Sequence, residues 1–139
     1  MIVLDTNIIA ALMRAAPDEA VQAWLDRQAA DSIWTTAINA FELHAGIEML
    51  ADRRRRQRLE QTLKAILAEE FEERLLPFDG AAAEAAAALW ARRRRVGRPV
   101  ELRDTQIAGI VVVHRARLAT FNGRHFSDLD VEVIHPHRS

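Results

Sequence analysis

Three carboxylates occupy positions in this chain that are suited to chemistry: Asp5, Glu42 and Asp104. Asp5 directly follows a short apolar run, residues 2–4, that is typical of a buried strand in a parallel sheet. A carboxylate at the carboxyl end of such a strand lies where open α/β sheets bind their ligands. Asp5 or its neighbour Thr6 could equally cap the helix that begins next. The position alone therefore leaves both roles open.

The other two carboxylates lie against apolar helix surfaces. Glu42 falls within an apolar arc of the helix expected over residues 37–51, whose central stripe consists of Ile38, Phe41, Ala45 and Met49. Asp104 adjoins an apolar face of the segment 101–116. A carboxylate on a buried face is unfavourable unless it is paired, protonated or bound to metal. A salt bridge to arginine, or a rim position where Glu42 reaches water, would remove the need for a metal.

If the three acids meet, their mutual repulsion raises their pKa values unless a cation neutralises them. A site made only of oxygen ligands suits a hard ion, Mg²⁺ or Mn²⁺. Such an ion can activate water for attack on a phosphodiester. The chain offers no convincing Ser-His-acid or Cys-His set, and we expect its histidines to be surface or terminal residues: His44, His114, His125, His135 and His137.

Strands and helices are expected to alternate along the chain. Short apolar runs predict strands at residues 2–4, 33–34, 75–78, 118–120 and 131–134. Periodicity and caps predict helices at residues 8–13, 17–30, 37–51, 53–71, 81–95 and 101–116. Thr35 and Thr36 are expected to cap the third of these helices, and Asp79 the fifth. The last helical segment is apolar all round and could be a strand, but its length favours a buried helix. This order predicts an α/β fold, a three-layer α/β/α sandwich with a mostly parallel central sheet.

Length and composition indicate one domain over residues 1–139, with 50% hydrophobic and 28% charged residues and a net charge of −1. The absence of cysteine excludes disulfide scaffolds and thiolate metal sites, and fits a cytoplasmic protein. No run approaches the ~20 apolar residues of a membrane span, and we expect no signal peptide. Two arginine runs, 53–56 and 92–95, are best explained as solvated helix ends, with RNA or dimer contact as the alternatives.

Five segments in a fixed order carry a family resemblance. They are Ile-Val-Leu-Asp-Thr-Asn at 2–7, Ala-Phe-Glu-Leu-His-Ala-Gly-Ile at 40–47, Leu-Pro-Phe-Asp at 76–79, Arg-Asp-Thr-Gln-Ile-Ala at 103–108 and Ala-Thr-Phe-Asn at 119–122. With them the chain resembles the PIN-domain family over nearly its whole length. It is most similar to the VapC-type ribonuclease toxins of bacterial toxin–antitoxin pairs, and among these to the FitB-like branch.

The resemblance implies a Mg²⁺- or Mn²⁺-dependent endoribonuclease whose three principal acids match Asp5, Glu42 and Asp104. Thr6 matches the family's hydroxyl beside the first acid, where it supports the ligands by hydrogen bonding. Asn122 departs from the pattern, because many relatives carry a fourth acid there, usually Asp. Asn keeps an oxygen ligand but loses a charge, so that a second metal would bind more weakly.

The resemblance also implies partners. We expect an RNA substrate, a homodimer, and a cognate antitoxin that wraps the toxin and blocks its active site. With the antitoxin the assembly would be a dimer of heterodimers or larger, and operator DNA would be bound only through the antitoxin. We expect an amphipathic antitoxin segment to lie in a groove between residues 8–30 and the helix over residues 53–71. No membrane partner is expected.

Three other functions fit part of the pattern. A PIN-like module could bind RNA or a protein without cutting, which Asn122 keeps open. A nuclease of related fold could act on DNA. A receiver-type phosphoacceptor domain is disfavoured, because it needs paired acids after the first strand and a late strand-end lysine. Here Asp5 is followed by Thr6 and Asn7, and the single lysine, Lys64, lies within a predicted helix.

Overall fold

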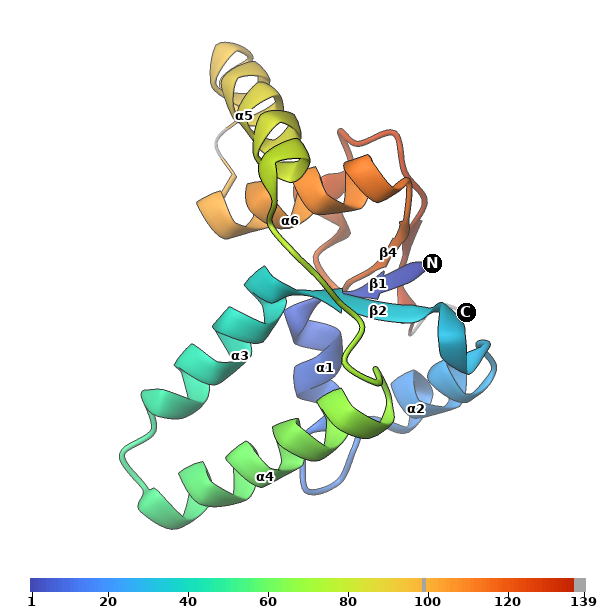
Figure 1. The fold of residues 1–139 in the computed structure, drawn as a ribbon, viewed down its shortest axis with the longest axis vertical. Coiled ribbons are helices and arrows are strands. Elements are labelled where there is room, and N and C mark those ends of the chain that lie inside the picture. Colours follow the sequence, from blue (N-terminus) through green and yellow to red (C-terminus); the bar gives the residue numbers. More distant parts are fainter. Residues whose placement is uncertain (99, 137–139) are drawn as a thin grey trace.

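The computed structural model describes residues 1–98 and 100–136, so that His137 lies outside the described residues. Five strands form one sheet in the order β3-β2-β1-β4-β5, and every neighbouring pair is parallel (Figure 1). Their bounds are β1 Ile2–Leu4, β2 Ile33–Thr36, β3 Leu75–Leu76, β4 Arg117–Ala119 and β5 Val133–Ile134. The chain therefore enters the sheet at its centre and builds outwards on both sides.

Helices cover both faces of the sheet, which confirms the predicted α/β sandwich (Figure 1). One face carries α1 Thr6–Leu12, α2 Glu19–Asp26, α3 Ala37–Glu48 and α4 Arg53–Glu69. The other carries α5 Gly80–Arg95 and α6 Leu102–His114, so the ambiguous apolar segment is a helix. No helix in the described part of the chain has the length and apolar character needed to cross a membrane.

The central strand supplies side chains to two hydrophobic cores. Ile2 and Leu4 pack with α1 to α4, whereas Val3 packs with α5 and α6. Successive side chains of a strand point to opposite faces of its sheet, so a strand covered on both sides reads as a continuous apolar run. All three side chains are fully buried. The residue that ends this run, Asp5, is thereby held at the centre of one sheet edge.

Polar residues cap the helices that begin at this edge. The Asp5 carboxylate accepts a hydrogen bond from the Thr6 N–H at the start of α1, and Thr36 Oγ1 accepts one from the Asn39 N–H in α3. Asp79 likewise caps α5, as its sequence position predicted. Each cap satisfies backbone donors that have no partner inside the helix. The carboxyl ends of β1 and β2 therefore bring polar groups to one place.

The apolar stripe predicted for α3 is wrong at Phe41 and Met49, whereas Ile38 and Ala45 are half-buried. Phe41 and Met49 are 56% and 85% exposed, while Ala40, Leu43 and Ile47 are buried. Apolar residues lie all round this helix, so that hydrophobicity alone does not single out the face that packs on α1 and α4. Glu42, next to Leu43, is half-buried at the edge of the buried face.

Candidate active site

Asp5 is the most deeply buried acid of the site, at 4% exposed. Its Oδ1 accepts hydrogen bonds from the Thr6 N–H at 2.8 Å and from Asn39 Nδ2 at 3.0 Å, and its Oδ2 accepts one from Thr120 Oγ1 at 2.7 Å. Burial raises the pKa of Asp5 above its usual value, and the charge of Asp104 raises it further, against the lowering effect of these hydrogen bonds. Asp5 thus caps α1 and faces a second acid at the same time.

Glu42 reaches the same place from α3. Thr6 Oγ1 donates to Glu42 Oε1 at 2.9 Å and itself accepts a hydrogen bond from Asn39 Nδ2 at 3.0 Å. The pKa of Glu42 is raised, first by burial and then by the charge of Asp5, with Asp104 adding a smaller effect. Thr6 and Asn39 therefore connect the first two carboxylates through a short hydrogen-bonded path.

A salt bridge to Glu42 exists, but it is a loose one. Arg103 Nε lies 3.6 Å from Glu42 Oε2, and it lies closer, at 2.9 Å, to Glu101 Oε1. Arg103 lowers the pKa of Glu42, but burial and the neighbouring acids outweigh it. A half-exposed, shared arginine contributes little to such a pair. The salt bridge does not account for the buried position of Glu42.

Asp104 lies in the first turn of α6, where Glu101 caps the helix. Its Oδ2 lies 2.7 Å from Nδ1 of His125, which belongs to the short 3₁₀ helix η2, Gly123–Phe126. The charge of Asp104 acts on both Asp5 and Glu42. His125 is partly exposed at the surface, as expected, with 41% of its side chain accessible, but it also contacts the third acid.

The charge of Asp104 acts on Asp5 and Glu42, but the three carboxylates do not converge on a single point. Within residues 1–98 and 100–136, no three acidic or histidine side chains are arranged closely enough to hold a metal ion as they stand. Each carboxylate is engaged by protein donors instead: Asp5 by Thr120 and Asn39, Glu42 by Thr6, and Asp104 by His125. The ligand atoms are all oxygen, and the pKa values of Asp5 and Glu42 are raised, which suits neutralisation by a hard divalent cation.

Asn122 lies near this edge, two residues after Thr120. Its side chain is exposed, and its backbone N–H donates to Thr120 Oγ1 at 3.0 Å. Among the described residues its side chain makes no hydrogen bond to Asp5, Glu42 or Asp104. The structure therefore places the three acids and Thr6 at one edge of the sheet, with Asn122 nearby but not hydrogen-bonded to the acids.

Asn39 and Thr120 are the residues that sequence reasoning missed. Both are fully buried, and both donate to Asp5. Thr120 directly follows β4, which pairs with β1, and the Asp5 N–H donates to the Ala119 carbonyl in that pairing. Neighbouring polar residues at the ends of paired strands were the available signal. Asn39 gave none, since it looks like an ordinary residue in the first turn of a helix.

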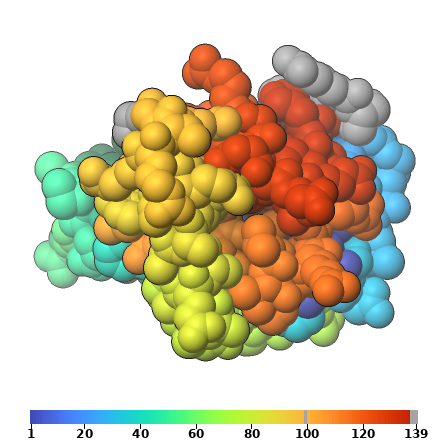
Figure 2. Space-filling view, turned by 90° about the horizontal axis from the view of Figure 1, so that it is seen from above, coloured from blue at the N-terminus to red at the C-terminus, as the bar shows by residue number. Residues whose placement is uncertain are grey.

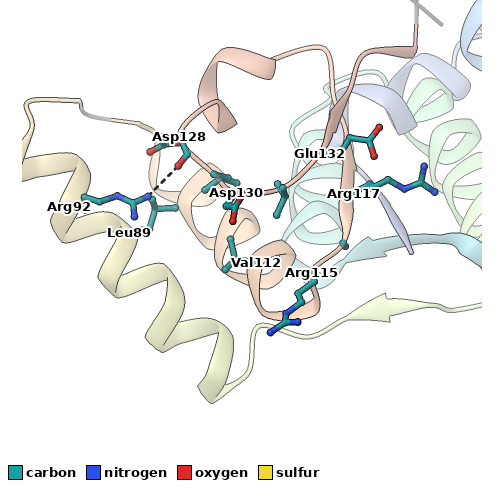
Figure 3. A pocket seen from close by; sticks show the side chains of 11 residues that line it. Leu89, Arg92, Val112, Arg115, Arg117, Asp128, Asp130 and Glu132 are labelled. Carbon is teal, nitrogen blue, oxygen red and sulfur yellow. Dashed lines mark hydrogen bonds between the residues drawn. The ribbon is translucent and has the colours of Figure 1, made fainter.

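A large cavity in the described part of the chain lies away from this site. A cavity of about 770 Å³ lies where β4 begins, between α5, the end of α6 and the segment before β5 (Figure 3). Its charged lining residues are of both signs: Arg92, Arg115, Arg117, Asp128, Asp130 and Glu132. None of the three acids lines it, and the carboxyl edge of the sheet is at the other end of β4.

A smaller groove of about 370 Å³ does reach the site. It is formed by α1, α3 and α4 and includes Thr6 and Glu42. Its apolar walls are Ala10, Met13, Leu43, Ile47, Leu50 and Leu59. Arg14 and Arg55 also line it, so that an apolar floor and two cations run up to the candidate site.

The structure is an α/β protein with an all-parallel sheet and with acids at the carboxyl edge of its central strands. Comparison with known proteins shows to which family of this class the chain belongs. The PIN domain model matches residues 2–132, and the chain belongs to the PIN-domain family. It is 34% identical over 136 residues to VapC ribonuclease Y4jK of Sinorhizobium fredii, covering 98% of this chain and 97% of that protein. It is 32% identical to toxin FitB of Neisseria gonorrhoeae, covering 98% of each chain.

Solved structures agree with this assignment. A structure of FitAB bound to an IR36 DNA fragment matches with a TM-score of 0.86 and 31% identity, covering 99% of this chain and 96% of that chain. VapBC-5 of Mycobacterium tuberculosis, described as a member of the VapBC family of toxin–antitoxin systems, matches with a TM-score of 0.67 and 29% identity, covering 96% of each chain. Within the PIN-domain family, the chain therefore groups with the VapC and FitB proteins.

Proposed function

We propose that this chain is a divalent-metal-dependent endoribonuclease and the toxin component of a type II toxin–antitoxin pair. One observation carries the proposal: at the carboxyl edge of the sheet, burial raises the pKa values of Asp5 and Glu42, and the charges of the neighbouring acids raise both further. Such an arrangement is unfavourable for the protein alone and becomes favourable when a cation neutralises it. The relationship to a VapC ribonuclease supports RNA as the substrate.

Asp5, Glu42 and Asp104 would hold Mg²⁺ or Mn²⁺, with Asn122 as a weak additional ligand. At such a site the ion would supply charge stabilisation at the phosphodiester and would lower the pKa of a bound water for its hydrolysis. The chain's own residues orient the carboxylates: Thr120 and Asn39 hold Asp5, and Thr6 holds Glu42. Arg103, half-exposed beside Glu42, offers a cation to the phosphates of the RNA.

The groove of α1, α3 and α4 supports an antitoxin partner. Its apolar walls fit the apolar face of an amphipathic helix, and Arg14 and Arg55 fit acidic residues beside that face. Because the groove includes Thr6 and Glu42, a bound segment would cover the site. Operator DNA would be bound through the antitoxin. A homodimer, larger assemblies with the antitoxin and a cytoplasmic location stay predictions.

The experiment that tests the activity compares cleavage of matched RNA and DNA strands with Mg²⁺, with Mn²⁺ and with excess EDTA. We expect RNA cleavage that requires a divalent ion and is lost in Asp5→Asn and Asp104→Asn. Asp31→Asn, which changes an exposed acid of the 3₁₀ turn before β2, is the matched control and should leave activity intact.

The alternatives predict different results. Cleavage in excess EDTA, or undiminished cleavage by the Asp5→Asn, Asp104→Asn double variant, would contradict the metal mechanism. Preferred cleavage of the DNA strand would make the chain a DNA nuclease. RNA binding without cleavage under any metal would make it a non-cleaving binding module.

A further inference from the structure

The contact between His125 and Asp104 joins the acid site to a segment distant in sequence. His125 Nδ1 and Asp104 Oδ2 are 2.7 Å apart. An ionised carboxylate only accepts hydrogen bonds, so that Nδ1 is the donor. The contact occupies Oδ2 of Asp104 and leaves Oδ1 for an ion.

A buried arginine fixes the segment that carries His125. Arg93 is 2% exposed, although it lies in a run of four arginines at the end of α5. Its Nη2 donates to the His125 carbonyl at 2.7 Å, and its Nε and Nη2 bind the two carboxylate oxygens of Asp128 at 2.8 Å each. Figure 2 shows the end of α5 lying beside this later segment on the surface of the molecule. These hydrogen bonds hold the backbone of His125 against the end of α5.

The same guanidinium also holds the other side of the contact. Arg93 Nη1 donates to Thr105 Oγ1 at 2.9 Å, and Thr105 directly follows Asp104 in α6. One side chain thus fixes the residue after Asp104 and the backbone of its partner His125. A bidentate, charge-assisted pair between arginine and aspartate gives this arrangement a defined geometry.

We propose that His125 is a positioning residue of the metal site, which holds Asp104 in the orientation that receives the ion, and that Arg93 anchors it. This inference rests on the proposed function. Hydrogen bonds from outside a metal site orient the ligating carboxylates, and their removal lowers metal affinity by about 10- to 100-fold. With Asn in place of an acid at position 122, the side-chain hydrogen bond that the described residues supply to the Asp104 carboxylate comes from His125.

The experiment measures Mn²⁺ binding to the full chain by titration calorimetry, together with thermal unfolding. His125→Ala removes the donor, whereas His125→Asn places an amide N–H near the position of Nδ1. His114→Ala is the matched control, because His114 is an exposed histidine at the far end of α6. We expect His125→Ala to weaken Mn²⁺ binding by about tenfold or more. We expect His125→Asn to keep most of the affinity and His114→Ala to keep all of it, with similar unfolding midpoints throughout.

The outcomes separate this inference from the proposed function. If the wild type binds Mn²⁺ and His125→Ala binds it equally well, His125 does not position Asp104. If both variants at position 125 lose affinity equally, the hydrogen bond is not the reason, and the inference also fails. If the wild type binds no Mn²⁺ and cleaves no RNA, the metal centre is wrong, and the positioning role is wrong with it.

Discussion

Glu42 shows most clearly the conflict between stability and function at the level of single residues. Its carboxylate is partly buried near Asp5 and Asp104, and its pKa is raised. A raised pKa means that the folded state binds the proton more tightly than the unfolded state does. Ionisation of Glu42 at neutral pH therefore destabilises the metal-free protein.

We expect Glu42→Gln to make the metal-free protein more stable at pH 7, because Gln removes the charge and its oxygen still accepts from Thr6. The gain should shrink as the pH falls through the raised pKa, where Glu42 itself becomes neutral. Each kcal/mol corresponds to about 2–4 °C in Tm for a chain somewhat longer than this one. Thermal unfolding between pH 5 and pH 8 measures the effect, and Glu48→Gln, exposed on the same helix, is the control.

Adding Mn²⁺ should reverse the order of the two proteins. The wild type gains stability from the bound ion in proportion to ln(1 + [Mn²⁺]/Kd), and Glu42→Gln gains less because it has lost a ligand. A variant that is less stable than the wild type without metal would contradict the raised pKa. Equal stabilisation of both proteins by Mn²⁺ would show that Glu42 is not a ligand of the ion.

Asn122 is the second residue whose replacement has a clear expected direction. Asn122→Asp adds a carboxylate to the edge that holds three acids, so that divalent-ion binding should tighten or gain a second equivalent. Because Asn122 is exposed, the variant should fold normally. Calorimetry with Mn²⁺ that shows unchanged affinity and stoichiometry would contradict this expectation.

The acids and Thr6 could be singled out from the sequence, but the other partners of the acids could not. Asp5, Glu42 and Asp104 stand out because carboxylates beside apolar surfaces require an explanation. His125 and Arg93 carry no such mark, since exposed histidines and arginine runs at helix ends are common. Their roles depend on how α5, α6 and the segment after β4 pack together, and this packing is a tertiary property.

At the level of elements, the contact between α5 and α6 determines where Asp104 lies. The two helices approach so closely at Gly109 that a Cβ there would lie 2.7 Å from the Ala82 carbonyl oxygen and 2.8 Å from the Ala86 Cβ. Small residues on both helices permit this approach. Because Gly109 is five residues after Asp104 in α6, the crossing fixes the helix that presents the third acid.

We expect Gly109→Ala to destabilise the protein by about 1–3 kcal/mol, since the contacting atoms are backbone and a Cβ that cannot rotate away. Gly46→Ala is the control, because a Cβ at Gly46 in α3 meets nothing within 4 Å. Removing this helical glycine should stabilise the protein by about 0.4–1 kcal/mol. Urea unfolding measures both, and equal effects of the two substitutions would show that the crossing is not tight.

The type and order of the elements follow from periodicity and caps, whereas their faces do not. Asp79 and Thr36 marked helix starts correctly, and the length of segment 101–116 identified it as a helix. The buried face of α3 was misplaced because Phe41 and Met49 are apolar but exposed. Hydrophobicity identifies a face only when the opposite side is polar.

At the level of the whole molecule, the sheet order places α1 to α4 on one side and α5 and α6 on the other (Figure 1). The candidate site lies at the edge between them, with acids from both sides. The groove opens on the first side only, so that a bound partner could reach the site without disturbing α5 or α6. The groove in which an antitoxin would bind is therefore on the opposite side of the sheet from Arg93, whose hydrogen bond to Thr105 fixes the helix of the third acid.

The groove therefore has its own test. We expect Ala10→Gln, on an exposed position of α1 in the groove wall, to place a polar chain where the antitoxin's apolar face binds. A misplaced polar group of this kind weakens binding by about 1–3 kcal/mol, which is about 5- to 150-fold. Affinity for the proposed antitoxin, measured after co-purification from the native operon, gives the result, and Ala87→Gln, exposed on α5, is the control.

RNA cleavage makes this test independent of the metal site. Ala10→Gln leaves all three acids in place, so that the free variant should cleave RNA like the wild type but escape inhibition by the antitoxin. Loss of inhibition in Ala87→Gln instead would move the interface to the α5 side. If no small protein co-purifies with the wild type from its native operon, the groove has no antitoxin to bind.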